Sequence, residues 1–386
     1  MNEYGMESRR KTNGLFSGLP TQPGMRRIGF WMSPKKLKKM DMAKFAVVCR
    51  TGGFELVQVD FARPLEEQGP FDVFLHKMTD LIVKAEQDDA GDSAEVGLFR
   101  VFESYMNANP QTIIIDPIEN LKKLLLRHRQ YHLIATSDAC LHDKVFTPPF
   151  VRLIASDSSQ MLRELRLAGV DFPVVCKAQE AHGSSDAHRM MIIFNADGLK
   201  SIKVPCVAQT FVNHDAVLYK VFVIGEKFHI VRRPSFENFY SFDLPPIAFD
   251  SQNITGSQWL EDIPVSRPPI AASSVPDVPA VALDPEIVTS IVKGVRKQFG
   301  LSLIGIDLIV DKTTGHYAII DVNAFPSYDG VTDFFPHLLS HIEMIVWQRD
   351  RHLSANHHSV HLKQPTGLKP TARIISNDLN PAIARS

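Results

Sequence analysis

Near the C-terminal end, two strand-like apolar runs each carry an aspartate where a buried strand would have valine or isoleucine. The runs are residues 304–310 and 318–323, and the sequence Thr-Thr-Gly at 313–315 separates them. Apolar runs of this length on either side of a glycine turn predict a β-hairpin. This hairpin restricts the chemistry of the chain strongly, because buried carboxylates are costly unless a cation lies beside them.

The length of the turn sets which residues face each other. With a three-residue loop and its glycine in the left-handed conformation, Lys312 pairs with His316 and Asp307 falls opposite Asp321. Asn323 lies two residues further along and points to the same face. Two carboxylates and an amide oxygen form a hard oxygen cluster, which suits Mg²⁺ held together with substrate phosphates. Two exposed aspartates on a surface hairpin are the alternative, which the apolar flanks of both strands disfavour.

The composition is ordinary for a globular protein with room for two or three domains. The chain has 386 residues, of which 44% are hydrophobic and 22% charged. A formal net charge of −1 gives no global attraction to nucleic acid or membranes, and we expect neither a signal peptide nor membrane insertion. The four cysteines are scattered, which predicts thiols in a reducing compartment. We therefore expect a cytoplasmic chain, with the nucleus as a second location.

Strand-like runs alternate with helical patterns in the first part of the chain. We expect strands at 27–32, 54–59, 71–77 and 112–116, and helices at 42–50 and 98–108. This alternation predicts an α/β fold with a mostly parallel sheet, which binds ligands at the carboxyl ends of its strands. Hairpins in the second half make that part α+β. The expected divisions are a disordered tail at 1–25, an N-terminal α/β domain at 26–117 joined by a C-terminal helix at 331–349, subdomains at 118–205 and 206–330, a long loop at 243–284 within the latter, and a flexible tail at 352–386.

Lysines stand at the ends of several predicted strands. Lys36 lies in a lysine run after the first strand, Lys77 ends the third, and Lys177 ends a later apolar strand before a glycine-containing loop. A lysine in that last setting reaches one phosphate oxygen while backbone N–H groups of the loop hold others. Lys220 lies within a strand and needs a partner, which a phosphate would supply. For Lys36 and Lys77, exposed side chains at a helix face or strand end are the alternative.

The nucleotide site, if there is one, is of neither the P-loop nor the protein-kinase type, since the chain has neither set of motifs. His182 and His188 flank a polar loop. They have no third soft ligand nearby for zinc, so contact with phosphate is favoured.

In chain order, a strand-end lysine, Gln209 at the start of a strand, and an Asp/Asp-x-Asn hairpin resemble the ATP-grasp superfamily. More closely, the chain resembles the animal form of the inositol-tetrakisphosphate 1-kinase family, also called inositol 1,3,4-trisphosphate 5/6-kinases. The matching strings run from about residue 26 to 345 and include GFWMSPKK at 29–36, HKMTD at 76–80 and IDVNAFP at 320–326. The resemblance implies a parallel-sheet domain that binds inositol phosphate, followed by two grasp subdomains with nucleotide between two antiparallel sheets.

The resemblance also implies an activity. It is Mg-ATP-dependent phosphorylation of inositol 3,4,5,6-tetrakisphosphate at the 1-hydroxyl and of inositol 1,3,4-trisphosphate at the 5- or 6-hydroxyl, by in-line phosphoryl transfer. Two Mg²⁺ ions per site and a monomeric chain are implied as well, with ATP and inositol polyphosphates as its partners.

Roles for single residues follow from the matched positions. The acceptor would be bound by Lys36, Lys77, His188, Lys220 and Asn323. ATP would be bound by Arg127, Lys177, Gln209, Lys220, Ser235, Ser251 and Thr255. Mg²⁺ would be bound by Asp307, Asp321 and Asn323, and the catalytic residues would be Lys220, Asp321 and Asn323.

The sequence departs from the family pattern at two places. Ser327 stands where the family usually has glycine, beside the acceptor pocket, and the loop at 182–188 is one residue longer than usual. Two other functions remain open at this point. One is an ATP-grasp carboxylate–amine ligase, which the lysines at 35, 36 and 77 disfavour because they suit a polyphosphate better. The other is a non-catalytic inositol-phosphate-binding protein.

Overall fold

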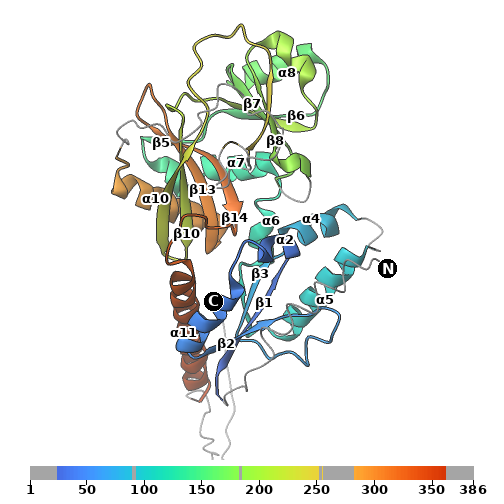
Figure 1. The fold of residues 1–386 in the computed structure, drawn as a ribbon, viewed down its shortest axis with the longest axis vertical. Coiled ribbons are helices and arrows are strands. Elements are labelled where there is room, and N and C mark those ends of the chain that lie inside the picture. Colours follow the sequence, from blue (N-terminus) through green and yellow to red (C-terminus); the bar gives the residue numbers. More distant parts are fainter. Residues whose placement is uncertain (1–23, 89–92, 182–184, 252–253, 255–281, 362–386) are drawn as a thin grey trace, which may run out of the picture. The chain divides into compact units, whose positions relative to one another are not determined.

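Three β-sheets, with helices packed against them, make up the computed structural model (Figure 1), which describes residues 24–88, 93–181, 185–251, 254 and 282–361. Residues up to Ile345 belong to one unit, and a second unit begins at Val346. Every site residue discussed below lies in the first unit. None of the described helices is both long and apolar enough to cross a lipid bilayer.

The first sheet is parallel, as the alternating pattern predicts. Its strands are β1 (Arg26–Met32), β2 (Phe54–Gln58), β3 (Val73–Lys77) and β4 (Ile113–Ile115), in the order β2-β1-β3-β4. The helices between them are α2 (Pro34–Leu37), α3 (Met42–Thr51), α4 (Thr79–Gln87) and α5 (Ala94–Ala108). Met32 pairs with Lys77, so the carboxyl ends of the two central strands lie side by side. Ligands of parallel sheets bind at such an edge.

The second sheet has five strands, all antiparallel to their neighbours, in the order β12-β8-β7-β9-β6. They are β6 (Phe150–Leu153), β7 (Val174–Ala178), β8 (Arg189–Ile193), β9 (Cys206–Thr210) and β12 (Ile247–Asp250). Helix α8 (Ser158–Leu167) and the short 3₁₀ segments η2 (Ser185–His188) and η3 (Ala196–Ser201) accompany this sheet.

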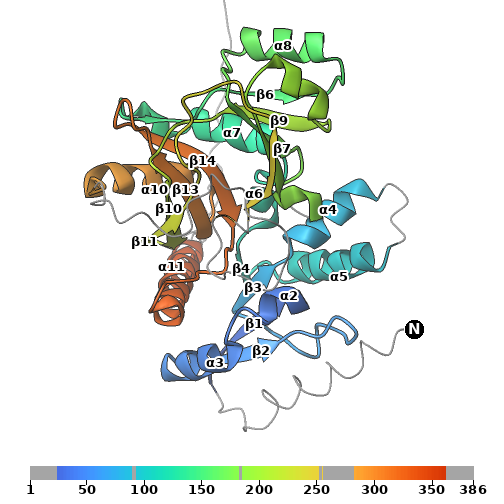
Figure 2. The same ribbon diagram turned by 45° about the horizontal axis from the view of Figure 1, so that its top comes forward.

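The third sheet also has five strands, in the order β11-β10-β13-β14-β5. They are β5 (Val145–Phe146), β10 (Val217–Ile224), β11 (Lys227–Pro234), β13 (Leu303–Val310) and β14 (Tyr317–Ala324). Only β5 is parallel to its neighbour. The two five-stranded sheets lie next to each other in both views (Figures 1 and 2), and Lys177 of β7 donates a hydrogen bond to the backbone of β14.

Helix α10 (Pro285–Phe299) covers the third sheet because it has one apolar face. Asp284 caps its first turn and Gly300 ends it in the left-handed conformation. Its buried side chains join those of β10, β13 and β14 in the main core. The remaining helical segments are α6 (Ile118–Lys122), α7 (Arg127–Ala135), η1 (Asp138–Leu141) and α11 (Phe334–His361).

Two predictions about irregular regions are wrong. The predicted long loop at 243–284 contains strand β12, in which Ile247 pairs with Ile192 of β8. Four residues are too few to give a visible period, and packing against β8 decides their conformation. The predicted tail from residue 352 begins as helix, since α11 continues to His361. No glycine or proline interrupts 352–361, and these residues tolerate helix. Residues 1–23, 362–386 and Thr255 lie outside the described residues.

Candidate active site

Strands β13 and β14 bring the three predicted metal ligands together. Asp307 pairs with Asp321, and Gly305 pairs with Asn323. The side-chain amide of Asn323 donates to Asp307 Oδ2 at 3.3 Å. The predicted facing of the two aspartates is therefore confirmed, and Asn323 is on the same face.

The turn that joins the strands differs from the predicted one. Asp311 N donates to His316 O, and Gly315 N donates to Asp311 O, both at 2.8 Å. The loop therefore has four residues, from Lys312 to Gly315, and the predicted pairing of Lys312 with His316 is wrong. Gly315 does adopt the left-handed conformation, with φ of 72°.

A β-bulge corrects the register before the strands reach the aspartates. Leu308 pairs with Ile319, but the next pair is Asp307 with Asp321, so Ile320 is the extra residue. A bulge leaves one residue outside the ladder and re-aims its neighbours. The carbonyl of Ile320 accepts a hydrogen bond from Lys177 Nζ at 3.1 Å.

Lys177 is buried between the two five-stranded sheets. Besides Ile320, its ammonium group donates to Tyr131 Oη at 2.8 Å and to Gln209 Oε1 at 2.9 Å. None of these acceptors carries a charge. Burial lowers the pKa of Lys177 to about 8, although the charge of Asp321 opposes the shift. A buried ammonium ion with only neutral acceptors at hydrogen-bond distance is suited to binding an anion.

The two carboxylates of the hairpin lie in the field of two lysines, Lys220 and Lys177. Lys220 faces Asp307 in the pairing of β10 with β13, and its Nζ lies 3.3 Å from Asp307 Oδ1. Asp321 Oδ1 is buried and has no hydrogen-bond partner in the part of the chain that the structure describes. Burial raises the pKa of Asp307; Lys220 opposes that shift and Asp321 adds to it. The clustered oxygen donors, among them a buried Asp321 oxygen without a hydrogen-bond donor among the described residues, fit a divalent hard cation such as Mg²⁺.

The two lysines of the parallel sheet reach the segment that follows Asn323. Lys36 Nζ donates to the carbonyls of Phe325 at 3.0 Å and Pro326 at 2.5 Å, and Lys77 Nζ donates to that of Ala324 at 2.5 Å. Burial lowers the pKa of Lys36 well below its usual range, and the charge of Lys77 adds to this. Burial also lowers the pKa of Lys77 to about 8.

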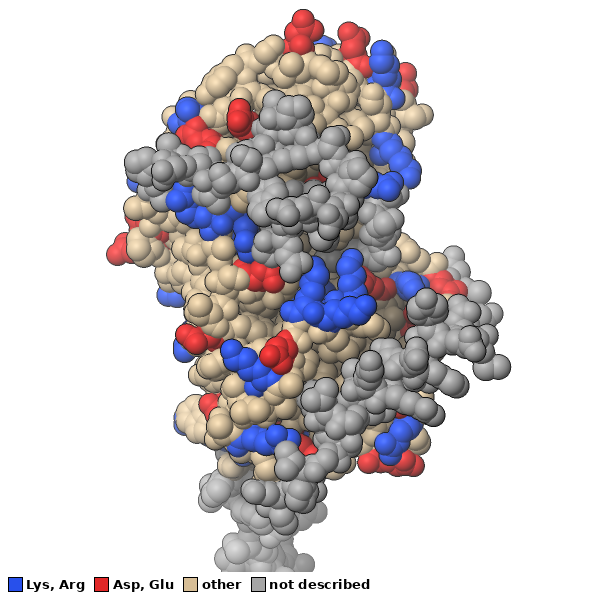
Figure 3. All heavy atoms as spheres, viewed as in Figure 1, with Lys and Arg blue, Asp and Glu red and all other residues tan. Residues whose placement is uncertain are grey.

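Helix α2 explains how one lysine is buried while its neighbours stay in solvent. Ser33 caps the helix, Pro34 occupies its first turn, and Lys36 turns inward. Lys35, Lys38 and Lys39 are exposed. Figure 3 shows Lys and Arg side chains gathered over this region of the molecule. A polyanion that approaches Lys36 therefore meets positive potential first.

Arg127 and His188 add a second group of donors. Arg127 is buried at the start of α7, and its Nη2 donates to Ala187 O at 2.8 Å. Its Nε and Nη1 have no hydrogen-bond partner among the described residues. Burial lowers the pKa of His188, and the charges of Asp250 and Arg127 also act on it. A buried guanidinium with unpaired N–H groups donates strong hydrogen bonds to an anion.

The other predicted nucleotide residues lie at strand ends. Ser235 is buried directly after β11, and its hydroxyl pairs with His214 Nε2 at 2.7 Å. Ser251 is half-buried and follows β12. Gln209 lies at the lysine described above. Thr255 cannot be placed, since it is outside the described residues.

Sequence reasoning missed two residues of α7. Tyr131 supplies an acceptor to Lys177, and the Gln130 side chain donates to Val322 O at 2.6 Å, between Asp321 and Asn323. Together with Arg127 they occupy positions i, i+3 and i+4 of one helix. That spacing is the signal that could have found them.

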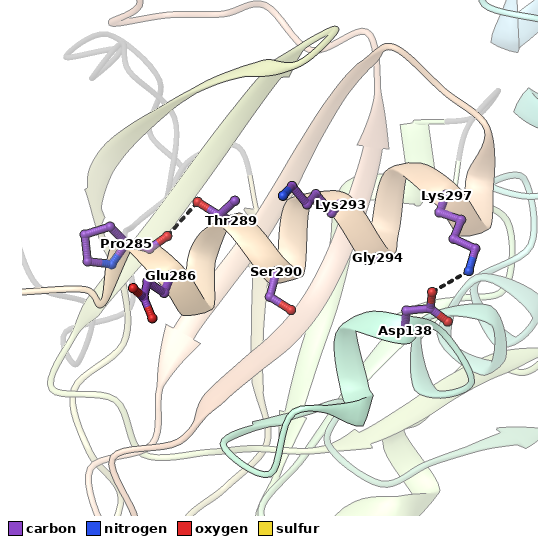
Figure 4. Close-up of a pocket in the computed structure, with 8 residues that line it drawn as sticks. All are labelled: Asp138, Pro285, Glu286, Thr289, Ser290, Lys293, Gly294 and Lys297. Carbon is purple, nitrogen blue, oxygen red and sulfur yellow. Dashed lines mark hydrogen bonds and ion pairs between the residues drawn. The ribbon is translucent and has the colours of Figure 1, made fainter.

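A cavity of about 550 Å³ lies away from these residues, along α10 (Figure 4). Figure 4 shows Thr289 and Lys293 on one side of α10 and Ser290 pointing away from the opposite side, with an ion pair between Lys297 and Asp138. None of the predicted site residues lines this cavity.

Two family profiles match the chain. One describes the ATP-grasp domain of inositol 1,3,4-trisphosphate 5/6-kinases and matches residues 139–344; the other describes their pre-ATP-grasp domain and matches residues 27–121. The chain belongs to the inositol 1,3,4-trisphosphate 5/6-kinase family. An inositol-tetrakisphosphate 1-kinase of Xenopus laevis is 43% identical over 342 residues, which are 87% of this chain and 82% of the relative. An inositol-tetrakisphosphate 1-kinase of Danio rerio is 40% identical, over 83% of this chain and 79% of the relative.

Solved structures show the fold alone. A D-cycloserine synthetase (DcsG) has a TM-score of 0.52 at 12% identity, covering 83% of this chain and 99% of its own. The ATP-grasp ligase PsnB, complexed with a phosphomimetic variant of its minimal precursor, Mg and ADP, also has a TM-score of 0.52. It is 14% identical and covers 84% of this chain and 98% of its own. With the family match, the predictions of an ATP-grasp fold and of an inositol polyphosphate kinase are confirmed.

Proposed function

We propose that this member of the family transfers the γ-phosphoryl group of ATP to inositol 3,4,5,6-tetrakisphosphate at the 1-hydroxyl and to inositol 1,3,4-trisphosphate at the 5- or 6-hydroxyl. One observation carries the proposal. Lys36 and Lys77 of the parallel sheet converge on the backbone directly after Asn323. The two lysines that would bind a polyphosphate acceptor therefore lie next to Asn323, one of the proposed metal ligands. The names of the Xenopus and Danio relatives support the same acceptor.

The nucleotide side of the site is assigned to the second sheet and α7. Lys177 and Arg127 bind the phosphates of ATP, because both are buried cations without an anionic partner at hydrogen-bond distance among the described residues. Gln209 orients Lys177. Ser235, Ser251 and Thr255 complete the nucleotide contacts, with the subdomains at 118–205 and 206–330 on either side of ATP.

Asp307, Asp321 and Asn323 hold the metal, as two Mg²⁺ ions per site. When bound, Mg²⁺ neutralises charge on the β- and γ-phosphates of ATP. The chain supplies the rest by position. Lys220 lies 3.3 Å from Asp307, so it reaches the same phosphates and keeps the two carboxylates from unscreened repulsion.

The acceptor side uses Lys36, Lys77, His188, Lys220 and Asn323. Among the described residues, the hydrogen-bond partners of both ammonium groups are backbone carbonyls, and burial lowers both pKa values. The acceptor phosphates replace those carbonyls as partners and stabilise the ammonium form. Phosphoryl transfer depends on alignment and charge neutralisation, so a strong general base is not required.

The remaining assignments concern the setting of the enzyme. We assign the acceptor-binding part to residues 26–117 with the helix at 331–349. Phe45 of α3 stacks on Phe335 of α11 with ring centroids 5.1 Å apart, which supports this grouping. The four cysteines are free, in keeping with the cytoplasm or nucleus. The enzyme acts as a monomer.

The test is to incubate the purified chain with Mg-ATP and a panel of inositol tris- and tetrakisphosphates, and to separate the products by anion-exchange chromatography. We expect one added phosphate on the two named acceptors and no product after chelation with EDTA. Tight binding without product would support a non-catalytic binding protein. ADP release that requires a carboxylate and an amine would instead support a ligase, and either result would overturn the proposal.

A further inference from the structure

Asp116 follows β4 and is 4% exposed. Its carboxylate oxygens accept hydrogen bonds from the backbone of the third sheet, from Ser302 N at 2.7 Å and Leu303 N at 2.9 Å. A carboxylate buried to this degree persists only with such donors. The side chain thus joins the end of the parallel sheet to the first residue of β13.

Two further hydrogen bonds lead from Leu303 to the acceptor side of the site. Leu303 O accepts from Phe325 N at 2.7 Å, and Phe325 O accepts from Lys36 Nζ at 3.0 Å. Asp116 therefore connects to Lys36 through two backbone residues. A shift at Asp116 moves the carbonyl that Lys36 contacts.

The backbone of Asp116 leads to the second lysine. Its carbonyl oxygen lies 2.8 Å from Nε2 of His76, the residue before Lys77 in β3. A carbonyl can only accept, so Nε2 carries the proton. Burial lowers the pKa of His76 to about 4, which keeps the ring neutral at physiological pH.

We infer that Asp116 is a positioning residue for acceptor binding: its carboxylate fixes β13 and residues 324–326 where Lys36 and Lys77 receive the acceptor phosphates. The inference rests on the proposed function and deepens it. Asp116 contacts backbone groups and His76, so its effect passes through these residues.

The strength of the two hydrogen bonds from Ser302 N and Leu303 N depends on the charge of the Asp116 carboxylate. The groups whose charges act on it or respond to it are Lys77 and His76 of β3, Arg296 of α10, and Tyr328. Burial raises the pKa of Asp116 to about 6, against the two backbone N–H groups and Arg296. Below that pH the carboxyl is protonated and accepts its two N–H donors less well, so acceptor binding weakens on the acid side.

The experiment compares wild type with Asp116→Asn, which keeps the size but directs an NH₂ group at one of the two N–H donors. At pH 7.5 we expect KM for the inositol tetrakisphosphate to rise about tenfold and KM for ATP to change less than about twofold. The ratio of wild-type to variant kcat/KM for the acceptor should fall towards one between pH 7 and 5. This ratio cancels the titration of the acceptor's own phosphates.

Asp138→Asn is the matched control, because Asp138 is an exposed aspartate whose partner is Lys297. The ratio of wild-type to Asp138→Asn kcat/KM for the acceptor should stay near one at every pH. Equal changes in both KM values of Asp116→Asn, or a ratio that is flat with pH, would overturn the inference. If wild type transfers no phosphate to any inositol phosphate, the proposed function falls and takes this inference with it.

Should Asp116→Asn not fold, wild type alone decides the question by hydrogen exchange. The amides of Ser302 and Leu303 should lose protection below pH 6 beyond the change in intrinsic exchange rate. Unchanged protection down to pH 5 would overturn the inference.

Discussion

Asp307 and Asp321 face each other across β13 and β14 at a β-bulge, and Lys220 is the cation at 3.3 Å from Asp307. The bulge at Ile320 sets this pairing, since the turn itself would place the strands one residue out of register. Lys220 approaches Asp307 from β10, on the side away from Asp321, so the two neighbouring carboxylates still repel each other until a divalent cation binds. The carboxylates of Asp307 and Asp321 are therefore explained by function better than by the stability of the metal-free protein.

Asp321→Asn should separate activity from stability. The variant loses one anionic metal ligand, so we expect kcat to fall by about 10²–10³-fold, on the scale of losing one group that stabilises transition-state charge. It removes repulsion from Asp307 but also a carboxylate that stabilises the buried Lys177 ammonium, so Tm in metal-free buffer should change by less than about 3 °C. Turnover with saturating Mg-ATP and thermal unfolding in EDTA measure the two effects.

Asp311→Asn in the loop of the same hairpin is the control, because the Asp311 carboxylate accepts hydrogen bonds from Thr313 N and Thr314 Oγ1 of the loop itself. Its kcat should stay within about twofold of wild type. Near-normal turnover of Asp321→Asn would refute the metal assignment.

The buried lysines predict an alkaline limit to activity. Burial lowers the pKa of both Lys77 and Lys177 to about 8, so each ammonium group is protonated below that pH and neutral above it. A neutral amine binds phosphate poorly. We expect kcat/KM to fall as pH rises above 8, for the acceptor through Lys77 and for ATP through Lys177. Steady-state kinetics between pH 6.5 and 9.5 test this.

Lys77→Arg assigns the two limits. Arginine stays charged over this range, so the acceptor profile of the variant should fall less steeply above pH 8 than that of wild type, since only Lys36 still titrates there, while the ATP profile is unchanged. If both profiles of the variant follow wild type, Lys77 does not control acceptor binding.

Local patterns carried the predictions that succeeded. The period of two predicts that Asp321 and Asn323 share one face, and the structure confirms it. This rule depends on residues close in sequence. The roles of Lys77 and Lys177 stay predictions; the structure has Lys77 at the end of β3 and Lys177 within β7. The four-residue turn and the compensating bulge are not predicted from the sequence, because loops of three and four residues differ little in sequence.

Contacts between distant segments could not be predicted from the sequence. Asp116 and Leu303 are 187 positions apart, and Asp116 was visible only as the last residue of an expected strand. Tyr131 lies 46 positions from Lys177, on a helix whose pattern gives no strong apolar face. In both cases tertiary packing chooses the hydrogen-bond partner. Ser327 could be singled out from sequence, but its effect on the backbone required the structure.

Ser327 should tune acceptor affinity through its hydroxyl. The segment has positive φ at Phe325 and Tyr328 but not at Ser327, so a Cβ is accommodated there. Its hydroxyl donates to Asp329 Oδ2 at 2.6 Å, and the charge of Asp329 acts on Lys36. Ser327→Ala removes one hydrogen bond to that carboxylate, so its charge acts more strongly on Lys36. We expect KM for the acceptor to rise about three- to tenfold with KM for ATP unchanged.

Ser327→Gly tests the backbone separately from the hydroxyl. It should behave as Ser327→Ala does if the hydroxyl is what matters. A wild-type KM for Ser327→Ala would count against the role of the hydroxyl, and a change in Ser327→Gly alone would point to chain flexibility.

The packing of α10 beneath the hairpin can be tested at a glycine. A Cβ built on Gly294 would lie 2.2 Å from Ala139 N and 2.7 Å from its Cα, and these backbone atoms of η1 cannot move without shifting the segment. Gly294→Ala should therefore destabilise the protein by about 1–3 kcal/mol, as overpacking does. Gly97→Ala is the matched control, because Gly97 lies in α5 with nothing within 4 Å of its Cβ position. It should stabilise the protein by about 0.4–1 kcal/mol. Urea unfolding of both variants measures the two signs, and a shift in the same direction for both would mean that α10 does not pack on η1 as described.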